Sequence, residues 1–147
     1  MPATKNFFTE TEQQEIIRAI QRAEALTSGE IRVHLEEKSG GHVLDRAAKI
    51  FNQLKMHETA ERNGVLIYLA IKDKQFAIIG DEGINKKVKE NFWDEIKEVM
   101  QQEFIQGRFM QGIIYAVEQA GEKLRQFFPL SVSDKNELTD ELSFNDD

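Results

Sequence analysis

The sequence of 147 residues predicts one α/β domain in which a small mixed β-sheet lies between layers of helices. Two segments with strand patterns are separated by a segment with a helical period, and such a unit forms a right-handed crossover between parallel strands. The second of these strands, residues 64–71, is apolar on both faces, which indicates helices on both sides of the sheet. The expected order of elements is α-β-α-β-β-α-α, a three-layer sandwich with three to four strands.

The first two expected elements are a capped helix and a strand. Thr9 or Thr11 is a suitable N-cap for a helix that runs to about Leu26 and carries its apolar residues on one stripe. From Glu30 to Glu37, polar and apolar residues alternate. This alternation is typical of a half-buried strand near the edge of a sheet.

Five further elements complete the expected fold. A 3.6-residue apolar period predicts a helix over residues 43–56. After the buried strand, a short polar turn returns the chain as a hairpin strand over residues 75–79. Two helices follow, over about residues 85–104 and 109–127, and Gly107 separates them.

The negative charge of the chain is concentrated at its C-terminal end. The formal net charge is -7, and residues 131–147 hold six acidic residues and one lysine, so they contribute -5 and leave -2 for the rest. Pro129 ends the last helical pattern, and the apolar residues beyond it have little periodicity. We therefore expect a folded domain over residues 1–129 and a flexible acidic tail over residues 130–147.

Composition and missing motifs exclude several classes of function. The sequence has no cysteine, so disulfides, thiolate nucleophiles and cysteine-bound zinc are excluded. It contains no dinucleotide or P-loop glycine signature, no serine nucleophile elbow and no apolar run long enough to span a bilayer. An acidic chain without a basic stripe is not expected to bind nucleic acid. Without a signal peptide or a spanning helix, we expect a soluble cytoplasmic monomer.

Topology brings several oxygen-bearing side chains to one end of the predicted sheet. The first two strands are parallel and begin at the same end, and the hairpin strand ends there. Glu30, Asn63 and Asp81 lie at these strand ends, with Glu61 and Glu82 beside them. Such oxygen donors suit a hard cation such as calcium or magnesium. The competing interpretation is that these carboxylates are simply solvated, above all Glu61 and Glu82.

Other groups support weaker interpretations. Gly80 and Gly83 precede a helix and could offer backbone N–H groups to an anion, but the acidic pair between them repels phosphate. The opposite end of the sheet, with Glu36, Glu37 and the turn at Asp73, is a weaker rival for a cation. Three histidines lack the spacing of paired metal ligands and are interpreted as ordinary surface or loop residues: His34, His42 and His57.

Four stretches of the sequence resemble the TPM domain family. Ser28–Val33 resembles the opening strand of that family, and Asn63–Leu69 resembles its central strand. Phe76–Ile84 is similar to the hairpin strand with its glycine turn, and Phe104–Gly112 to the F-x2-G-x-[YF]-x2-G stretch before the last helix. The resemblance covers about residues 8–128.

The resemblance implies a small twisted sheet of four strands and an acidic calcium site on loops at the end of that sheet. Carried over residue by residue, it implies Glu30, Asp81 and Glu82 as metal ligands, with Asp94 matching an acidic position early in the following helix. Asn63 joins this candidate set through its place at the same end of the sheet.

Two functions follow from the resemblance. Some members are acid phosphatases, which implies metal-dependent turnover of a phosphorylated substrate. Others are non-catalytic modules, which implies that the metal orders loops that recognise a protein partner. No residue of this chain is assigned a catalytic role, and no organic cofactor is expected.

Overall fold

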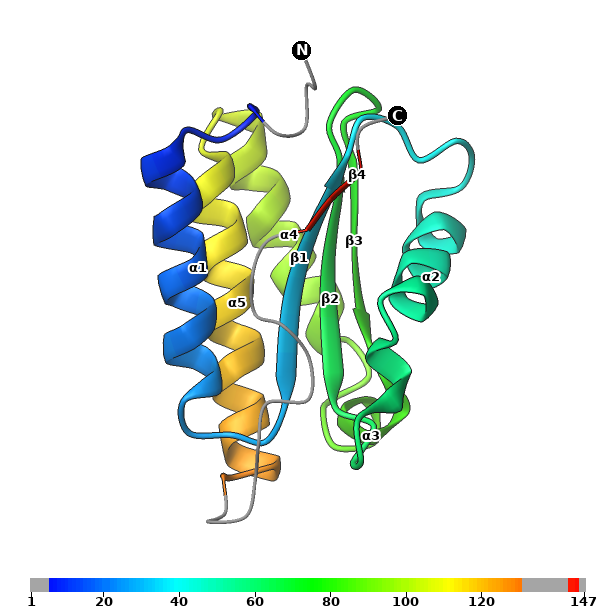
Figure 1. Cartoon of the computed structure of the whole chain (residues 1–147), viewed down its shortest axis with the longest axis vertical. Coiled ribbons are helices and arrows are strands. Elements are labelled where there is room, and N and C mark those ends of the chain that lie inside the picture. Colours follow the sequence, from blue (N-terminus) through cyan, green and yellow to red (C-terminus); the bar gives the residue numbers. More distant parts are fainter. Residues whose placement is uncertain (1–5, 131–142, 146–147) are drawn as a thin grey trace.

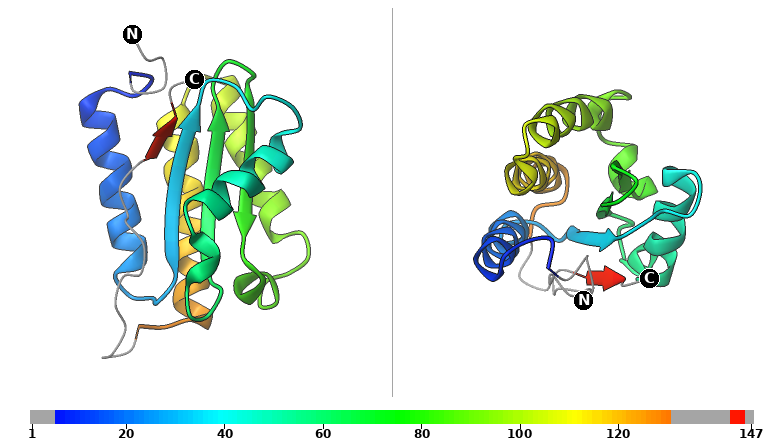
Figure 2. Two further views of the ribbon diagram at one scale, coloured as in Figure 1. Left: turned by 45° about the vertical axis from the view of Figure 1, so that its right-hand side comes forward. Right: turned by 90° about the horizontal axis from the view of Figure 1, so that it is seen from above.

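The computed structural model describes residues 6–130 and 143–145 as a sandwich of three layers (Figure 1). Three helices form one layer, a four-stranded sheet forms the middle, and α2 with the 3-10 helix η1 forms the third, as Figure 2 shows from above. The expected fold class and order of elements are confirmed. No helix in the described ranges is long and apolar enough to cross a membrane. The elements have these bounds: α1 Glu10–Glu24, β1 Glu30–Glu36, α2 Val43–Gln53, η1 Met56–Glu58, β2 Gly64–Ala70, β3 Gln75–Gly80, α3 Glu82–Asn85, α4 Phe92–Ile105, α5 Phe109–Phe127 and β4 Ser143–Asn145.

The sheet has the order β3-β2-β1-β4 and mixes parallel with antiparallel pairs. β1 and β2 are parallel, with Glu30 opposite Gly64, as expected for a strand–helix–strand unit. β3 runs antiparallel to β2, so the C-terminal end of β3 lies beside the N-terminal end of β2 and at the same end of the sheet as the start of β1. We call this end of the sheet the Asp81 end, after the residue that follows β3.

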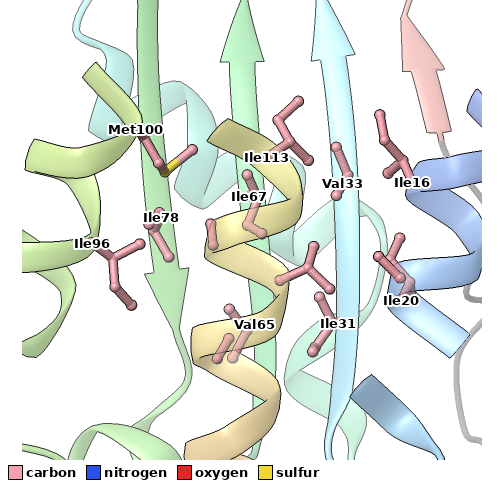
Figure 3. Packing of buried hydrophobic residues seen from close by; sticks show 14 of the residues in the cluster. Ile16, Ile20, Ile31, Val33, Val65, Ile67, Ile78, Ile96, Met100 and Ile113 are labelled. Carbon is pink, nitrogen blue, oxygen red and sulfur yellow. The ribbon is translucent and has the colours of Figure 1, made fainter. Parts of the chain in front are cut away.

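The larger apolar core fills the space between the sheet and the helices α1, α4 and α5 (Figure 3). Alternate residues of two strands face this core, Ile31 and Val33 from β1 and Val65 and Ile67 from β2. Their burial between the layers attaches the three helices to the sheet. The helices contribute apolar stripes with a helical period: Ile16 and Ile20 of α1, Ile96 and Met100 of α4, and Ile113 of α5.

The opposite face of the sheet carries a smaller core beneath α2. Leu66 and Tyr68 of β2 belong to this core together with Ile50 and Phe51 of α2 and Met56 of η1. All seven residues of β2 are buried, as its uninterrupted apolar sequence indicated.

Two helices begin with side-chain caps. Thr9 Oγ1 accepts the backbone N–H of Glu12 at 3.0 Å, and the Glu12 side chain accepts the backbone N–H of Thr9 at 2.9 Å. Of the two predicted caps of α1, Thr9 and Thr11, this reciprocal pair of hydrogen bonds identifies Thr9 as the N-cap. His42 caps α2 through its ring Nδ1, which accepts the Leu44 N–H at 3.3 Å.

β1 is more deeply buried than its alternating sequence indicated. Every residue of β1 except Arg32 is buried, so the prediction of a half-buried strand is wrong. The physical reason is that a polar side chain on its second face pairs with protein groups instead of water. Glu36 accepts hydrogen bonds from Arg46 and Tyr68.

The boundaries of two helices differ from the predicted ones. The helix predicted over residues 43–56 ends at Gln53 and is followed by η1. The helix predicted over residues 85–104 begins only at Phe92, as α4, and the short helix α3 precedes it. The indole Nε1 of Trp93 donates a hydrogen bond to Asn85 Oδ1 at 2.7 Å, which ties the start of α4 to the end of α3.

Residues 143–145 of the expected C-terminal tail are described, and they form β4. Ser143 lies opposite His34 in a parallel pair with β1. The sequence did not predict this strand, because three residues are too few to display a period. Residues 131–142, 146 and 147 of the expected tail lie outside the described residues, so the flexible tail stays a prediction.

Candidate functional site

The Asp81 end places Glu30, Gly64 and Asp81 in one row across the sheet. Glu30 lies opposite Gly64 in the pairing of β1 with β2, and the Asp81 N–H donates to Gly64 O at 2.9 Å. Residues in register on neighbouring strands point to the same face of a sheet, here the face that α2 and η1 cover. Strand direction therefore does gather residues from three distant segments, as expected.

Asp81 is held by hydrogen bonds from two directions. It is the N-cap of α3, and its Oδ1 accepts the backbone N–H of Glu82 at 2.8 Å. Arg62 donates to both carboxylate oxygens, from Nε to Oδ2 at 2.7 Å and from Nη2 to Oδ1 at 2.9 Å. This bidentate geometry fixes the plane of the carboxylate as well as its position.

Arg62 supplies a cation of the protein's own to this end of the sheet. Its guanidinium also reaches Glu82, with Nη1 3.4 Å from Oε1. The hydrogen bond to Asp81 raises the pKa of Arg62 above its ordinary value. The Arg62 side chain is 43% exposed, whereas that of Asp81 is 7% exposed. The guanidinium can therefore leave the two carboxylates for water without opening the core.

Gly83 is required for packing rather than for binding. A Cβ at this position would lie 2.1 Å from Glu61 O and 2.5 Å from Arg62 O, which are both backbone atoms. The Gly83 N–H donates to Arg62 O at 2.8 Å, and the Glu82 N–H donates to Asp81. Both N–H groups are engaged, which argues against the anion site that the two glycines suggested.

Asn63 lies next to Arg62 in the loop that enters β2, and only 1% of it is exposed. Its Nδ2 donates to Ser28 Oγ at 3.2 Å and to Glu61 Oε2 at 3.5 Å. Ser28 Oγ donates to the same Glu61 oxygen at 3.0 Å. Asn63 Oδ1 is buried and accepts no hydrogen bond from the described residues. A buried carbonyl oxygen without a donor is a group that a hard cation can satisfy.

Glu30 is buried at the same end of the sheet but does not meet Asp81. The two residues lie two strands apart, which is about 10 Å by the ordinary spacing of strands. Met56 occupies the space above Gly64 between them, since its carbonyl oxygen lies 3.0 Å from the place that a Gly64 Cβ would take. The structure therefore keeps Glu30 apart from Asp81.

Asp94 lies in the first turn of α4 and faces solvent. Its side chain is 76% exposed, and its ion-pair partner is Lys97, with Oδ1 3.8 Å from Nζ. No described hydrogen bond or ion pair joins Asp94 to Asp81 or Glu82.

Three predicted ligands remain, Asn63, Asp81 and Glu82, and Arg62 binds the two carboxylates among them. We call Arg62, Asn63, Asp81 and Glu82 the Asp81 cluster. Its two carboxylates and its carbonyl oxygen are donor types that calcium and magnesium prefer. In the described part of the chain, no group of three or more histidine, cysteine, aspartate or glutamate residues is arranged to hold a metal ion. At the Asp81 cluster, the Arg62 guanidinium takes the hydrogen bonds of both carboxylates, so a cation has to displace it.

A second polar cluster is buried near the other end of β1 on the same face. The sequence analysis pointed to its Glu36 as a weaker cation candidate but did not identify the partners that bury it. Glu36 is fully buried, Arg46 Nε donates to both of its oxygens, and the Tyr68 hydroxyl donates to Oε2. His34 Nε2 lies 3.8 Å from Glu36 Oε1, and His34 Nδ1 lies 2.6 Å from Ser143 Oγ. We call His34, Glu36, Arg46 and Tyr68 the Glu36 cluster. The sequence does contain one sign of this cluster: Tyr68 carries the only side-chain hydroxyl in an otherwise apolar central strand.

Burial dominates the electrostatics of the Glu36 cluster. Burial lowers the pKa of His34 to about 4, and the charges of Arg32 and Arg46 act in the same direction against the opposing effect of Glu36. Burial, followed by the hydrogen bond to Glu36, raises the pKa of Tyr68. His34 is therefore a neutral buried residue at neutral pH. The interpretation of His34 as a surface or loop residue is wrong, because α2, β2 and β4 surround its face of β1.

Several solved structures resemble this chain. The NMR structure of the BA42 protein from the psychrophilic bacterium Bizionia argentinensis is 47% identical, covers 95% of this chain and 96% of its own, and superposes with a TM-score of 0.87. The N-terminal domain of the cg2496 protein from Corynebacterium glutamicum is 14% identical, with 92% and 79% of the two chains covered and a TM-score of 0.55. The second likeness concerns the fold alone.

The family comparison agrees with the resemblance seen in the sequence. No curated protein matches the chain by sequence. The family model described as the TPM domain matches residues 3–123, which is most of the chain and includes every residue of the Asp81 cluster. The chain belongs to the TPM domain family.

Proposed function

We propose that the Asp81 cluster binds a divalent cation, calcium first and magnesium second. The observation that carries the proposal is the Arg62 guanidinium, a cation already held by Asp81 and Glu82 near the surface. The negative potential of these carboxylates attracts the guanidinium, and it would attract a metal cation in the same way. The family resemblance, which implies an acidic calcium site at this end of the sheet, supports the same assignment.

Each residue of the cluster has a distinct role in the proposal. Asp81 is the fixed ligand, because its place at the start of α3 holds it independently of Arg62. Glu82 is 59% exposed and can turn toward the cation. Asn63 adds its carbonyl oxygen, which has no donor among the described residues. Glu30 and Asp94 are left out, since Met56 separates the first from Asp81 and the second faces solvent.

The character of the site favours calcium over magnesium. Calcium accepts six to eight oxygen ligands in a flexible geometry, whereas magnesium requires near-octahedral ligands at shorter distances. The Asp81 cluster offers one fixed carboxylate, one mobile carboxylate and an amide oxygen, with access to water for the other positions. An irregular set of this kind suits the larger ion.

A binding module is favoured over a phosphatase. A metal at this site would supply charge for phosphate oxygens and an activated water. The N–H groups of Glu82 and Gly83, however, are engaged within the protein and leave no backbone donors at this turn for a phosphoryl group. We expect the cation to order the loop before β2 and the start of α3 as a surface for a protein partner. Turnover of p-nitrophenyl phosphate that requires metal and disappears in Asp81→Asn would establish the phosphatase instead.

Calcium titration by calorimetry tests the site, with Asp81→Asn as the disabling variant. Asparagine is as good an N-cap as aspartate, so α3 keeps its start while the site loses a full charge. We expect saturable binding to the parent protein and binding at least about tenfold weaker in the variant.

Asp94→Asn is the matched control, because it removes the same charge from an exposed position of α4. It should bind calcium like the parent protein. Equal losses in the two variants, or binding that neither variant affects, would contradict the proposed site. Urea unfolding of each variant establishes that the fold is intact at the titration temperature.

A further inference from the structure

A cavity of about 720 Å³ lies at the end of the sheet opposite Asp81. It is bounded by the hairpin between β2 and β3 and by the ends of α4 and α5 that meet there (Figure 1). Its volume falls within the range of about 300–1,000 Å³ that is usual for small-molecule sites. Neither the Asp81 cluster nor the Glu36 cluster contributes to it, so it needs its own explanation. We call it the hairpin cavity.

The apolar wall of the hairpin cavity is preformed by aromatic rings that hold one another. The centroids of Phe76 and Phe104 lie 5.0 Å apart in an edge-to-face contact, and Phe104 stacks on Phe109 at 5.3 Å. Phe7 meets Phe109 edge to face at 5.1 Å. Mutual contacts of this kind fix each ring before any ligand arrives. Ile105, which is 77% exposed, adds an aliphatic rim to the wall.

The polar lining of the hairpin cavity has a single charge, and that charge is positive. The described lining residues include Lys74 and two glutamines but no acidic residue, although the chain has 26 acidic residues. Among the described residues, no ion pair engages Lys74, whereas Lys72 in the same turn pairs with Glu37 at 3.2 Å. Lys74 also sits at φ 53°, a left-handed conformation that sets the direction of the turn beside the cavity.

We propose that the hairpin cavity binds a small amphipathic carboxylate, with its apolar body against the phenylalanine wall and its carboxylate toward Lys74. Apolar walls provide the burial that drives binding, and one cation without a competing acid selects a negative head group. An amine of the same length would meet like charge, and an alcohol would gain the apolar contact alone. This site is independent of the cation site proposed above.

Titration of the full chain with decanoate below its micelle concentration, followed by NMR, tests the proposal. We expect saturable shifts of the Phe76, Phe104 and Ile105 amide signals and affinities in the order decanoate, decanol, decylamine. Equal or tighter binding of decylamine would overturn the charge argument. Shifts that spare the cavity would overturn the site. Binding to phosphatidylglycerol vesicles without binding of monomeric decanoate would also overturn it, because the wall would then be a membrane contact.

Lys74→Asn removes the charge and keeps the turn, since asparagine adopts positive φ more readily than most residues. Decanoate binding should weaken roughly two- to fivefold, the range of one partly exposed ion pair, while decanol binding stays unchanged. Lys72→Asn is the matched control and should bind decanoate like the parent protein. A loss of decanol binding in Lys74→Asn, or an equal loss of decanoate binding in the control, would contradict the role of Lys74.

Discussion

The two ends of the sheet each carry an arginine–carboxylate pair on the face beneath α2, and the pairs differ in burial. In the Glu36 cluster the carboxylate is fully buried, and Arg46 is 22% exposed. In the Asp81 cluster the carboxylate is 7% exposed and Arg62 is 43% exposed. Each arginine donates hydrogen bonds to both carboxylate oxygens of its partner. The two ion pairs therefore have the same chemistry and differ in how far water reaches them.

This difference separates a structural pair from an exchangeable one. Removing one partner of a buried ion pair leaves an uncompensated charge in a medium of low dielectric constant. An arginine near the surface can instead exchange its carboxylate for water at little cost in free energy. The Glu36 cluster therefore maintains the fold, whereas Arg62 of the Asp81 cluster is the arginine that the proposed cation would replace.

The largest expected effect is the loss of stability in Arg46→Met. The substitution keeps most of the side-chain volume but leaves the Glu36 carboxylate buried without its guanidinium partner. Breaking a buried pair in this way lowers the free energy of unfolding by about 3–5 kcal/mol. Urea unfolding measures the change.

Arg62→Met is the matched variant at the other end of the sheet. It should lower the free energy of unfolding by clearly less than Arg46→Met, because water reaches the Arg62 side chain. Equal losses in the two variants would remove the distinction between a structural and an exchangeable pair.

The second effect is a loss of stability in acid that comes from His34. Its pKa is lowered from 6.5 to about 4, so the folded protein stays deprotonated at pH values where the unfolded chain binds a proton. Protonation of His34 in the unfolded chain therefore lowers the free energy of unfolding as the pH falls from about 6.5 toward 4. The full loss is about 3 kcal/mol, and above about pH 6.5 there is none.

His34→Gln should remove this part of the pH dependence from unfolding curves measured between pH 7 and 4. An unchanged slope in His34→Gln would show that other groups cause the acid sensitivity.

The smallest effect concerns competition between Arg62 and the cation. Arg62→Gln removes the guanidinium that a cation must displace, so calcium should bind about two- to fivefold more tightly by calorimetry. Arg108→Gln makes the same change of charge at an exposed pair with Glu103 and should leave the affinity unaltered. Weaker binding in Arg62→Gln would mean that Arg62 positions the ligands and does not compete with the cation.

Periodicity and strand direction made most of the fold predictable. The central strand and its hairpin partner follow from an apolar run and a turn, and their directions alone place Asp81 beside the start of β2. Local patterns of this kind need no knowledge of distant contacts. The strand β4 escaped prediction because three residues carry no pattern, and its pairing with β1 depends on a distant segment.

The details of the sites depend on packing that no local pattern records. Gly83 packs against the backbone of Arg62, and this contact places the Arg62 guanidinium beside Asp81. Met56 fills the space above Gly64 and so separates Glu30 from Asp81. Both facts arise from tertiary contacts, which is why the sequence could indicate the end of the sheet but not the membership of the cluster.

NMR of the arginine Nε–H groups during a calcium titration shows directly whether Arg62 is exchangeable while Arg46 is not. Arg62 Nε donates to Asp81 at 2.7 Å and Arg46 Nε donates to Glu36 at 2.9 Å, so one spectrum reports both pairs. We predict a saturable shift of the Arg62 signal as calcium displaces the guanidinium, with the Arg46 signal unmoved. An Arg62 signal that stays in place at calcium saturation, or two signals that move together, would contradict the account.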